Sequence, residues 1–262
     1  MNPVISLGFI SIHLYSICLM VGVIVGYYLI VRESGRHGFD IDDVGNMMFY
    51  AIIFGIIGAR IYYCLFNLDY YLSSPLSIFK VWEGGLAIHG GIIAGFFTIL
   101  YYCKKKKYNL LLVLDFIVVG LIIAQAIGRW GNFFNGEAHG PITTLSYLKR
   151  LFLPNFIIRG MYIDGFYYIP TFLYESLWCL LGFIIMYLVR SKKIIKVGYL
   201  SSFYFIWYGI ERFFVESLRT DSLMLFNLKV AQIISLFMII IGIVIFIYSF
   251  KKSNIYREEY YD

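Results

Sequence analysis

The chain has 262 residues, of which 60% are hydrophobic and only 15% are charged. A soluble domain of this size would have about a quarter of its residues charged, so the composition excludes an ordinary soluble domain. The apolar residues fall in blocks long enough to cross a bilayer, which indicates a polytopic helical membrane protein. The formal net charge of +6 is mostly due to short basic clusters beside apolar blocks, so it gives no indication of nucleic-acid binding.

Seven apolar segments are each predicted to form a membrane-spanning helix. The N-terminal segment has neither a basic n-region nor a small-residue cleavage site, so it is expected to be retained as the first span. Without internal repeats or low-complexity linkers, the sequence predicts one all-α integral membrane domain over residues 1–262. The expected spans cover residues 9–31, 47–66, 84–103, 110–127, 170–189, 198–215 and 230–250, and residues 128–168 are expected to form a small folded extracytoplasmic cap.

Basic clusters follow the third, fifth and seventh predicted spans, at residues 104–107, 190–196 and 251–252. Loops rich in Lys and Arg face the cytoplasm, so this pattern predicts an N-terminus outside and a C-terminus inside. The polar stretch after span four, the beginning of span three and the end of span six then all lie on the outer side. A single outward-facing site built from several spans is the simplest explanation.

The stretch Gly128–Glu137 reads GRWGNFFNGE and combines Arg129, Asn132 and Glu137 with three glycines. A guanidinium group is a planar fork of donors that fits a phosphate or a carboxylate. Polar groups at membrane depth are costly unless they are used, so the stretch predicts a site for an anionic headgroup. The structural alternative is an interfacial turn with snorkelling charges.

The third predicted span begins with WEGGLAIHGG and places His89 about two turns inside the expected helix start. A histidine at this position could serve as a general base, because its ordinary pKa lies near neutrality. The alternative is a packing histidine bonded to a neighbouring span. Ala87, Gly91 and Gly95 repeat every four residues, which predicts a small-residue stripe that another helix or a lipid can approach closely.

In the sixth predicted span, polar residues recur at intervals of four, four and three. This spacing places them on one helical face, which must point into the bundle and not at lipid. Arg212 is predicted to pair with Glu216, either as a structural ion pair or as a carboxylate that orients an arginine for an anionic substrate. The four residues are Tyr208, Arg212, Glu216 and Arg219.

The other candidate residues are given lesser roles. Arg60 and Asp115 lie inside predicted spans and are expected to form structural pairs across spans. Tyr15 and the Tyr174–Glu175 pair belong to the same outer layer but rank second, since buried tyrosines usually only satisfy a hydroxyl. His139 is expected to be a loop residue.

No sequence feature supports a metal or a cofactor. The four cysteines lie in or at the ends of apolar blocks without metal-like spacing, so buried free thiols are expected. The four histidines are scattered, and no two share a predicted helix at ligand spacing. Neither a nucleotide-binding loop nor a glycine-flanked nucleophilic serine stands out.

The stretch GRWGNFFNGE resembles the signature of the prolipoprotein diacylglyceryl transferases, bacterial inner-membrane enzymes of lipoprotein maturation. Every fixed position of the pattern G-R-x-G-N-F-x-N-x-E is met, and further blocks at 58–63, 82–91, 170–175 and 208–219 occur in the family's order. The departures are small. Ile169 stands where the family usually has a histidine, and the arginine that the family often has near His13 is missing.

The resemblance implies transfer of a diacylglyceryl group from phosphatidylglycerol to the lipobox cysteine thiol of a prolipoprotein. A thioether forms and glycerol 1-phosphate leaves, without a cofactor, in the cytoplasmic membrane of a bacterium. By the same resemblance, His89, Arg129, Arg212 and Glu216 are expected to be catalytic. The residues expected to bind substrate are Arg129, Asn132, Glu137, Tyr15, Tyr208, Arg219 and Gly91.

Two other classes of function are alternatives. A transporter or channel for an anionic solute would also use intramembrane arginines, but the polar groups gather on one side and no two-halves repeat is present. A membrane acyltransferase that uses a soluble acyl carrier would need a site facing inward, opposite to the charge pattern. For the transferase, both routes to a thiolate remain open: a base such as His89, or a thiol pKa lowered beside the arginines.

Overall fold

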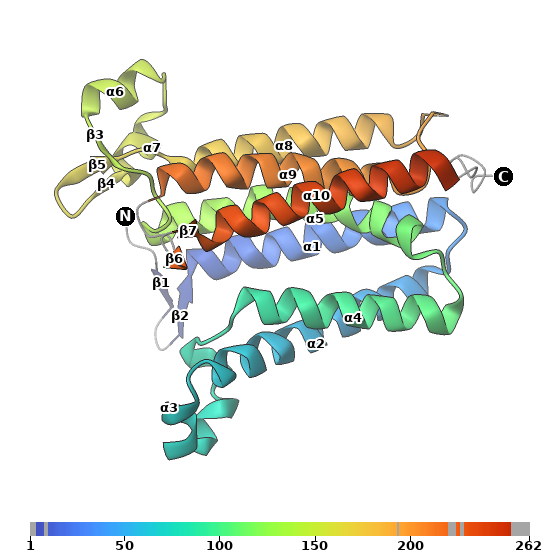
Figure 1. The fold of residues 1–262 in the computed structure, drawn as a ribbon. Coiled ribbons are helices and arrows are strands. Elements are labelled where there is room, and N and C mark those ends of the chain that lie inside the picture. The colour runs from blue at the N-terminus through green and yellow to red at the C-terminus, as the bar shows by residue number, and fades with distance from the viewer. Residues whose placement is uncertain (1–3, 8–9, 193, 220–223, 226–227, 253–262) are drawn as a thin grey trace. The chain divides into compact units, whose positions relative to one another are not determined.

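The computed structural model describes residues 4–7, 10–192, 194–219, 224–225 and 228–252, and it is mostly helical (Figure 1). The chain divides into two compact units. The first unit combines Met1–Ile30 with Leu114–Asp262, and the second unit is Val31–Val113.

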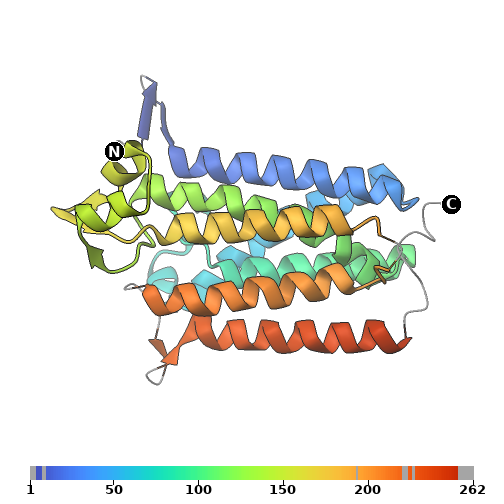
Figure 2. The ribbon, with the colours of Figure 1, turned by 90° about the horizontal axis from the view of Figure 1, so that it is seen from above.

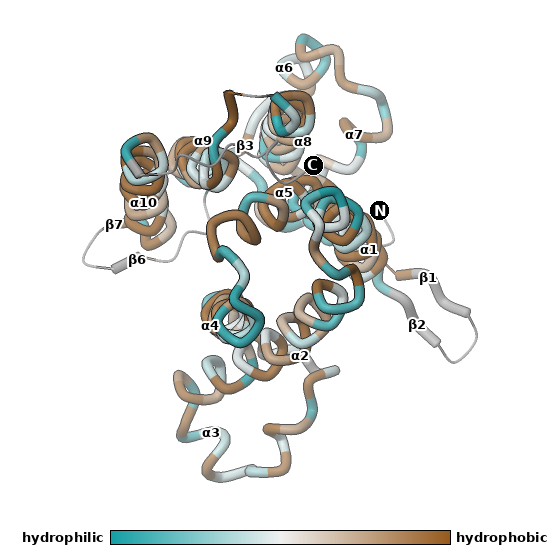
Figure 3. Tube along the Cα trace, turned by 90° about the vertical axis from the view of Figure 1, so that its right-hand side faces the viewer, coloured by the Kyte–Doolittle hydropathy of each residue, from teal (hydrophilic) through white to brown (hydrophobic). Residues whose placement is uncertain are grey.

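Five of the described helices are long and apolar enough to cross a membrane: α1 (Leu14–Arg36), α2 (Ile41–Leu65), α5 (Leu110–Asn135), α8 (Thr171–Val189) and α10 (Val230–Lys252). Figure 3 shows hydrophobic residues along most of α10. Two more long helices, α4 (Ile88–Lys106) and α9 (Tyr199–Leu218), match the third and sixth expected segments but are not among these five. The prediction of a polytopic helical membrane protein is confirmed, and the count of seven spans stays a prediction.

The expectation of an all-α chain misses short antiparallel strands. At the N-terminus, β1 (Val4–Leu7) pairs with β2 (Ile10–His13), with Val4 opposite His13. The helix α1 therefore begins at Leu14 and not near residue 9, and His13 lies in a strand. A second hairpin joins β6 (Met224–Leu225) and β7 (Leu228–Lys229) just before α10.

The polar stretch expected to form a loop from residue 128 is helical as far as Asn135, because α5 continues through it. The helix ends at Gly136, which has a φ of 67° that glycine adopts without strain. The Gly136 N–H donates to Phe133 O at 3.2 Å and the Glu137 N–H donates to Asn132 O at 3.1 Å. This pair of bonds is the Schellman motif, which satisfies carbonyls at the end of a helix.

In the first unit, small residues let α1 lie directly on α5. A Cβ built on Gly26 would lie 2.8 Å from Gly120 O, and one built on Gly22 would lie 2.9 Å from Ala124 O. The helices α8, α9 and α10 lie side by side in sequence order (Figures 1 and 2). Trp178 of α8 and Trp207 of α9 stack with ring centroids 4.3 Å apart, and each indole N–H donates to the other residue's carbonyl.

The carboxylate of Asp115, which is fully buried in α5, binds the beginning of α9. It accepts hydrogen bonds from Gly198 N at 2.7 Å, Ser201 N at 2.8 Å and Ser201 Oγ at 2.7 Å. Free N–H groups at a helix start favour such an anionic acceptor. The structural role expected for Asp115 therefore includes a backbone partner that residue spacing could not predict.

We expect Asp115→Ala to lower the free energy of unfolding by about 3 kcal/mol or more, since each buried donor left without a partner costs about 1–3 kcal/mol. Asp40 is the matched control, because it caps α2 in the same way from an exposed position, accepting from Asp42 N and Asp43 N. Asp40→Ala should cost only about 1 kcal/mol. Denaturant unfolding of both variants measures the two losses in the free energy of unfolding. Equal losses would contradict this prediction.

Residues between α5 and α8 form a small folded segment of the first unit. Its sheet has the order β3 (Ile142–Thr143), β5 (Phe166–Tyr168), β4 (Tyr162–Ile163), and two short helices accompany it, α6 (Leu145–Arg150) and α7 (Asn155–Gly160). The buried residues of α6 and α7 pack with both ends of the connection, on Phe133 of α5 and Phe172 of α8, whose rings stack with centroids 4.6 Å apart. The segment is thus anchored to the two helices that it joins.

In the second unit, α2 and α4 approach along small residues. A Cβ on Gly90 would lie 2.3 Å from Gly58 O, and one on Gly91 would lie 3.3 Å from Gly55 O. Of the predicted small-residue stripe, Gly91 and Gly95 therefore face α2, whereas Ala87 is the N-cap residue that precedes the helix. The helix α4 begins at Ile88 instead of Gly84, because Gly84 and Gly85 have φ values of 91° and 75° that a helix does not accept.

Arg60 of α2, which is 7% exposed, holds the connection to α4 through backbone carbonyls. This connection comprises α3 (Leu68–Ser73) and two 3₁₀ turns, Pro75–Phe79 and Val81–Glu83. The prediction that Arg60 pairs with a charge on another span is therefore wrong, because its guanidinium group donates to backbone carbonyls. They belong to Ser77, Ile78, Lys80, Gly84 and Gly85, at 2.5 to 3.3 Å.

Candidate functional site

Two arginines of the first unit converge on one buried carboxylate. Arg129 of α5 forms an ion pair through Nε with Glu175 Oε2 of α8, and Arg212 Nη1 of α9 lies 3.5 Å from Glu175 Oε1. Glu175 is 1% exposed, whereas both arginine side chains are 18% exposed. Three helices that are distant in sequence therefore meet at this carboxylate.

The arginines have further partners on α9. Arg129 Nη2 donates to Tyr208 Oη at 3.2 Å, and Arg212 Nη2 pairs with Glu216 Oε2 at 2.6 Å. The predicted Arg212–Glu216 pair is confirmed, because positions four apart are neighbours on a helix surface. We define the arginine cluster as Arg129, Glu175, Tyr208, Arg212 and Glu216.

The cluster lies on helices that are locked together. The stacked Trp178 and Trp207 join α8 to α9, and the Ser176 hydroxyl donates to Ala126 O of α5 at 2.9 Å. Trp130 Nε1 in turn donates to Ser176 Oγ at 3.2 Å. Because these bonds fix α5, α8 and α9, they hold Arg129 and Glu175 in place.

The rest of the polar stretch closes the end of α5. Asn132 Nδ2 donates to Glu137 Oε1 at 2.9 Å, and Asn135 Nδ2 lies 3.5 Å from the same oxygen. Glu137 is exposed. The amides and carboxylate that the sequence suggested as one group are therefore brought together, one turn beyond Arg129.

Tyr15 lies against the same stretch from α1. A Cβ built on Gly131 would come within 2.8 Å of Tyr15 Cδ2 and 3.3 Å of its Cα, so only glycine admits this approach. Arg219, in contrast, is the C-cap residue of α9, where its extended backbone ends the helix. Arg219 therefore lies just beyond the end of the helical face that carries Tyr208, Arg212 and Glu216.

His89 and Gly91 belong to the second unit. His89 is the second residue of α4, and the expectation that it lies two turns inside the helix is wrong, because the helix begins at Ile88. Its ring is exposed, 6.3 Å from that of Tyr62 between centroids. Gly91 faces α2 at Gly55. The prediction that His89 shares a cavity with Arg129 and Arg212 stays a prediction.

Two carboxyls of the first unit are more central than the sequence predicts. Glu175 ranks only second among the predicted residues, although both arginines pair with it. Glu211, next to Arg212, is not among the predicted site residues, yet it is 4% exposed and lies in the field of the charges of Glu175, Arg129 and Arg212. Its position inside an apolar segment was the only available signal, since such a carboxyl is costly unless used. The remaining candidate, His139, stacks on Tyr168 at 3.9 Å between centroids, as a loop residue.

An apolar groove of about 370 Å³ lies on α1, α5 and α8 of the first unit. Ile17, Cys18 and Val21 line it from α1, Ile123, Ala126, Ile127, Trp130 and Phe134 from α5, and Ser176 and Leu180 from α8. Two of its lining residues, Trp130 and Ser176, directly follow the cluster residues Arg129 and Glu175 in the chain. Its lining residues are uncharged and mostly aliphatic or aromatic.

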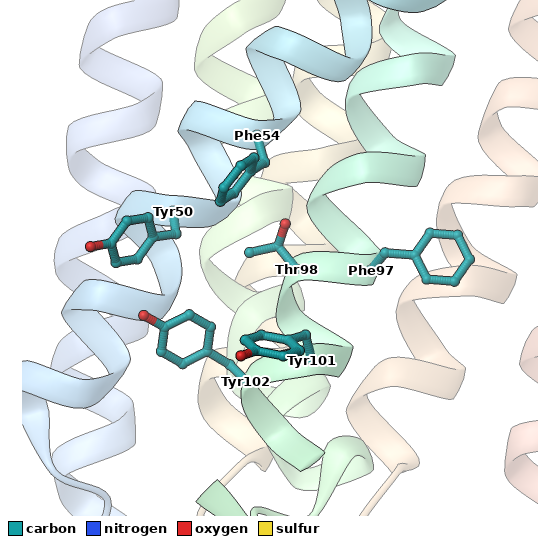
Figure 4. A pocket seen from close by; sticks show the side chains of 6 residues that line it. All are labelled: Tyr50, Phe54, Phe97, Thr98, Tyr101 and Tyr102. Carbon is teal, nitrogen blue, oxygen red and sulfur yellow. The ribbon is translucent and has the colours of Figure 1, made fainter. Parts of the chain in front are cut away.

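A second groove, of about 450 Å³, lies on α2 and α4 of the second unit and is lined by aromatic residues and one threonine (Figure 4). Tyr50 and Tyr102 stack across it with centroids 6.0 Å apart. None of its lining residues is charged, so it lacks the chemistry expected of the site. All four cysteines are free thiols, and Cys64, Cys103 and Cys179 are buried as predicted, whereas Cys18 is only partly buried. Within the described ranges, no group of three His, Cys, Asp or Glu residues is placed to hold a metal ion.

The helices and the arginine cluster define a polytopic membrane protein that combines arginine–carboxylate pairs with an apolar groove in the same unit, chemistry suited to the headgroup and the acyl chains of an anionic lipid. The family model of prolipoprotein diacylglyceryl transferase matches residues 2–248. The chain therefore belongs to the prolipoprotein diacylglyceryl transferase family.

Relatives from staphylococci, each named phosphatidylglycerol–prolipoprotein diacylglyceryl transferase, are similar over nearly their whole length. The protein of Staphylococcus haemolyticus is 48% identical over 257 residues, which cover 97% of this chain and 90% of the relative. That of Staphylococcus aureus is 46% identical over 250 residues, covering 95% and 89%. That of Staphylococcus saprophyticus is 48% identical over 243 residues, covering 92% and 87%.

Proposed function

We propose that the protein transfers the diacylglyceryl group of phosphatidylglycerol to the lipobox cysteine thiol of a prolipoprotein, forming a thioether and releasing glycerol 1-phosphate. The observation that carries this proposal is the convergence of Arg129 and Arg212 on Glu175, in a unit that also holds an apolar groove. A phosphodiester with two acyl chains needs both an anion site and an apolar site. Family membership and the names of the relatives support the same reaction.

In this proposal, the phosphate of the donor lipid binds Arg129 and Arg212, and acyl chains lie in the groove on α1, α5 and α8. Guanidinium groups held in advance by carboxylates need little reorganisation when negative charge grows on the leaving phosphate. Asn132, Glu137 and Tyr15 shape the outer end of the site around the headgroup. Tyr208 and Glu216 hold the two arginines, and Gly91 and Arg219 stay candidate substrate contacts.

The acceptor thiol must become a thiolate to attack the glyceryl carbon. We propose His89 as the base, on the grounds of its imidazole and its exposed position at the start of α4. The neighbouring Gly90 and Gly91 have no side chains, which leaves room beside the ring. The alternative is a thiol ionised by the arginines alone.

The direct test of the reaction uses purified protein in vesicles of phosphatidylglycerol labelled in its glyceryl backbone, with a lipobox peptide as acceptor. We expect a labelled thioether peptide and free glycerol 1-phosphate, and no product from a peptide with Cys replaced by Ser. Depletion in the cell should leave prolipoproteins unprocessed. An anion transporter would instead move solute across the vesicles and form no thioether.

We propose seven spans, made by α1, α2, α4, α5, α8, α9 and α10, with the N-terminus outside, the C-terminus in the cytoplasm and the segment between α5 and α8 as an extracytoplasmic cap. The basic residues at 104–107, 190–196 and 251–252 support this orientation. We expect a phosphatase reporter fused after residue 252 to be inactive and one inserted in the cap to be active. Because this reporter is active only outside the cytoplasm, an active C-terminal fusion would contradict the topology.

His89→Gln keeps a polar side chain of similar size and removes the base. We expect phosphatidylglycerol binding to change by less than about threefold and transfer to slow by about 100-fold or more, the usual effect of losing a general base. His139→Gln, in the folded segment between α5 and α8, is the matched control and should leave transfer unchanged. Normal turnover per folded His89→Gln molecule would show that the ring has no direct role.

A further inference from the structure

Glu211 of α9 is a buried carboxyl without a hydrogen-bond partner. The residue is 4% exposed, and neither Oε1 nor Oε2 finds a donor among the residues that the structure describes. Burial of an ionised carboxylate without such partners is very costly, and groups in this situation usually take up a proton. The proposed roles of the arginine cluster do not use this side chain.

The charges around Glu211 also favour a neutral acid. Glu211 directly precedes Arg212 on α9 and lies three residues after Tyr208, so its carboxyl is in the field of Arg129, Glu175 and Arg212. Arg129 already pairs with Glu175, and Arg212 already pairs with Glu216 at 2.6 Å. An ionised Glu211 would be a third carboxylate against two guanidinium groups, and like charges in a buried site disfavour ionisation of one of them.

Within the part of the chain that the structure describes, one donor of the cluster makes only a long ion pair and no hydrogen bond. Arg212 Nη1 is buried without a hydrogen bond among the described residues, and its nearest carboxylate oxygen, Glu175 Oε1, is 3.5 Å away. A neutral carboxyl offers an O–H donor. Together, a free guanidinium N–H and a carboxyl O–H can both donate to a phosphate oxygen, whereas an ionised Glu211 would repel it. A protonated Glu211 is therefore compatible with an anionic ligand at Arg212.

We propose that Glu211 is protonated in the resting protein and delivers its proton to the phosphate oxygen that leaves the donor lipid. This inference rests on the proposed function. The acceptor sulfur bonds to the glyceryl carbon, the bond between that carbon and the phosphate oxygen breaks, and its electron pair goes to the oxygen. The Glu211 proton moves to the phosphate, and the proton lost by the thiol restores the acid, so no other reactant is needed.

Infrared spectroscopy tests the protonation state without any activity. We expect wild-type protein in phosphatidylglycerol vesicles at neutral pH to show the carbonyl band of a buried carboxylic acid, and Glu211→Gln to lack it. Asp43→Asn is the matched control. Asp43 accepts bonds from Lys106 Nζ at 2.8 Å and Tyr108 Oη at 3.0 Å, as an ionised carboxylate does, so the acid band should persist in that variant.

Transfer kinetics test the proton delivery. Glu211→Gln has the shape of the neutral acid but no proton to give, so we expect phosphatidylglycerol to bind within about twofold of wild type and turnover to fall by about 10²- to 10⁴-fold. Glu211→Asp keeps a transferable proton and should turn over at least tenfold faster than Glu211→Gln. A purely structural role would instead lower the yield of folded protein and leave turnover per folded molecule unchanged.

Three results would overturn the inference: a wild-type spectrum without an acid band assigned to Glu211, normal turnover of Glu211→Gln, or normal turnover of a Glu211→Asp variant that has no acid band. The last result can be obtained with Glu211→Asp even when Glu211→Gln does not fold. Failure of the proposed function is distinguishable from these, because wild-type protein would then form no thioether. Normal wild-type transfer together with normal Glu211→Gln transfer overturns the inference alone.

Discussion

Arg129→Lys is expected to slow diacylglyceryl transfer by about 100-fold or more, the usual cost of removing one donor that stabilises a developing negative charge. Lysine keeps the positive charge but loses the planar fork. In the structure, different nitrogens of Arg129 reach different helices, Nε to Glu175 of α8 and Nη2 to Tyr208 of α9. A single ammonium group cannot bridge both partners and still face a phosphate.

The measurement is turnover per folded molecule in vesicles with a lipobox peptide, together with binding of phosphatidylglycerol. Arg150→Lys is the control, because Arg150 ends α6 in an exposed position and undergoes the same chemical change. It should transfer at the wild-type rate. A normal rate for Arg129→Lys would mean that charge alone suffices and that the fork has no role.

Local regularities of the sequence predicted those features that lie within one helix or at one contact between two helices. The Arg212–Glu216 pair follows from the fourfold spacing on α9. Gly91 and Gly95 predicted a close helix neighbour, and Gly91 does approach Gly55 of α2. The membrane class followed from composition alone.

Features that depend on tertiary contacts could not be predicted in this way. Arg60 resembles a charge that needs a carboxylate, but its guanidinium is satisfied by carbonyls of the connection 77–85. The polar composition of GRWGNFFNGE suggested a loop, whereas four glycines and asparagines of this stretch lie inside α5, where the Tyr15 side chain occupies the space beside Gly131. In both cases a neighbour from another segment decides the conformation.

Glu175 shows the same limit for the candidate site. On α8 it stands in an apolar segment without a charged residue at i±3 or i±4, so spacing gives it no partner. Its partners come from α5 and α9 and are visible only once the three helices are assembled. The position of a buried carboxylate between two arginines is therefore a property of the fold. Its substitution is the change for which we expect the largest combined effect on stability and turnover.

Glu175→Gln is expected to lower the free energy of unfolding by about 3–5 kcal/mol, since removal of one member of a buried ion pair leaves the other charge uncompensated. Arg129 and Arg212 would lose their common anchor, although each keeps its bond to α9. We expect transfer per folded molecule to fall by about 100-fold, because misplaced arginines no longer face the phosphate together. Binding of the anionic lipid should stay equal or tighten, because a negative charge is removed.

Glu33→Gln separates this positioning effect from general loss of stability. Glu33 is also buried, at 5% exposure, and it lies 3.4 Å from Arg36 Nη1 and 3.7 Å from His37 Nε2. That variant should unfold more easily but keep its turnover per folded molecule, because none of these groups belongs to the arginine cluster. If Glu175→Gln behaved like Glu33→Gln, with lower stability and unchanged turnover, Glu175 would only hold helices together. Slower transfer with undiminished lipid binding is the result that a carboxylate positioning two arginines requires.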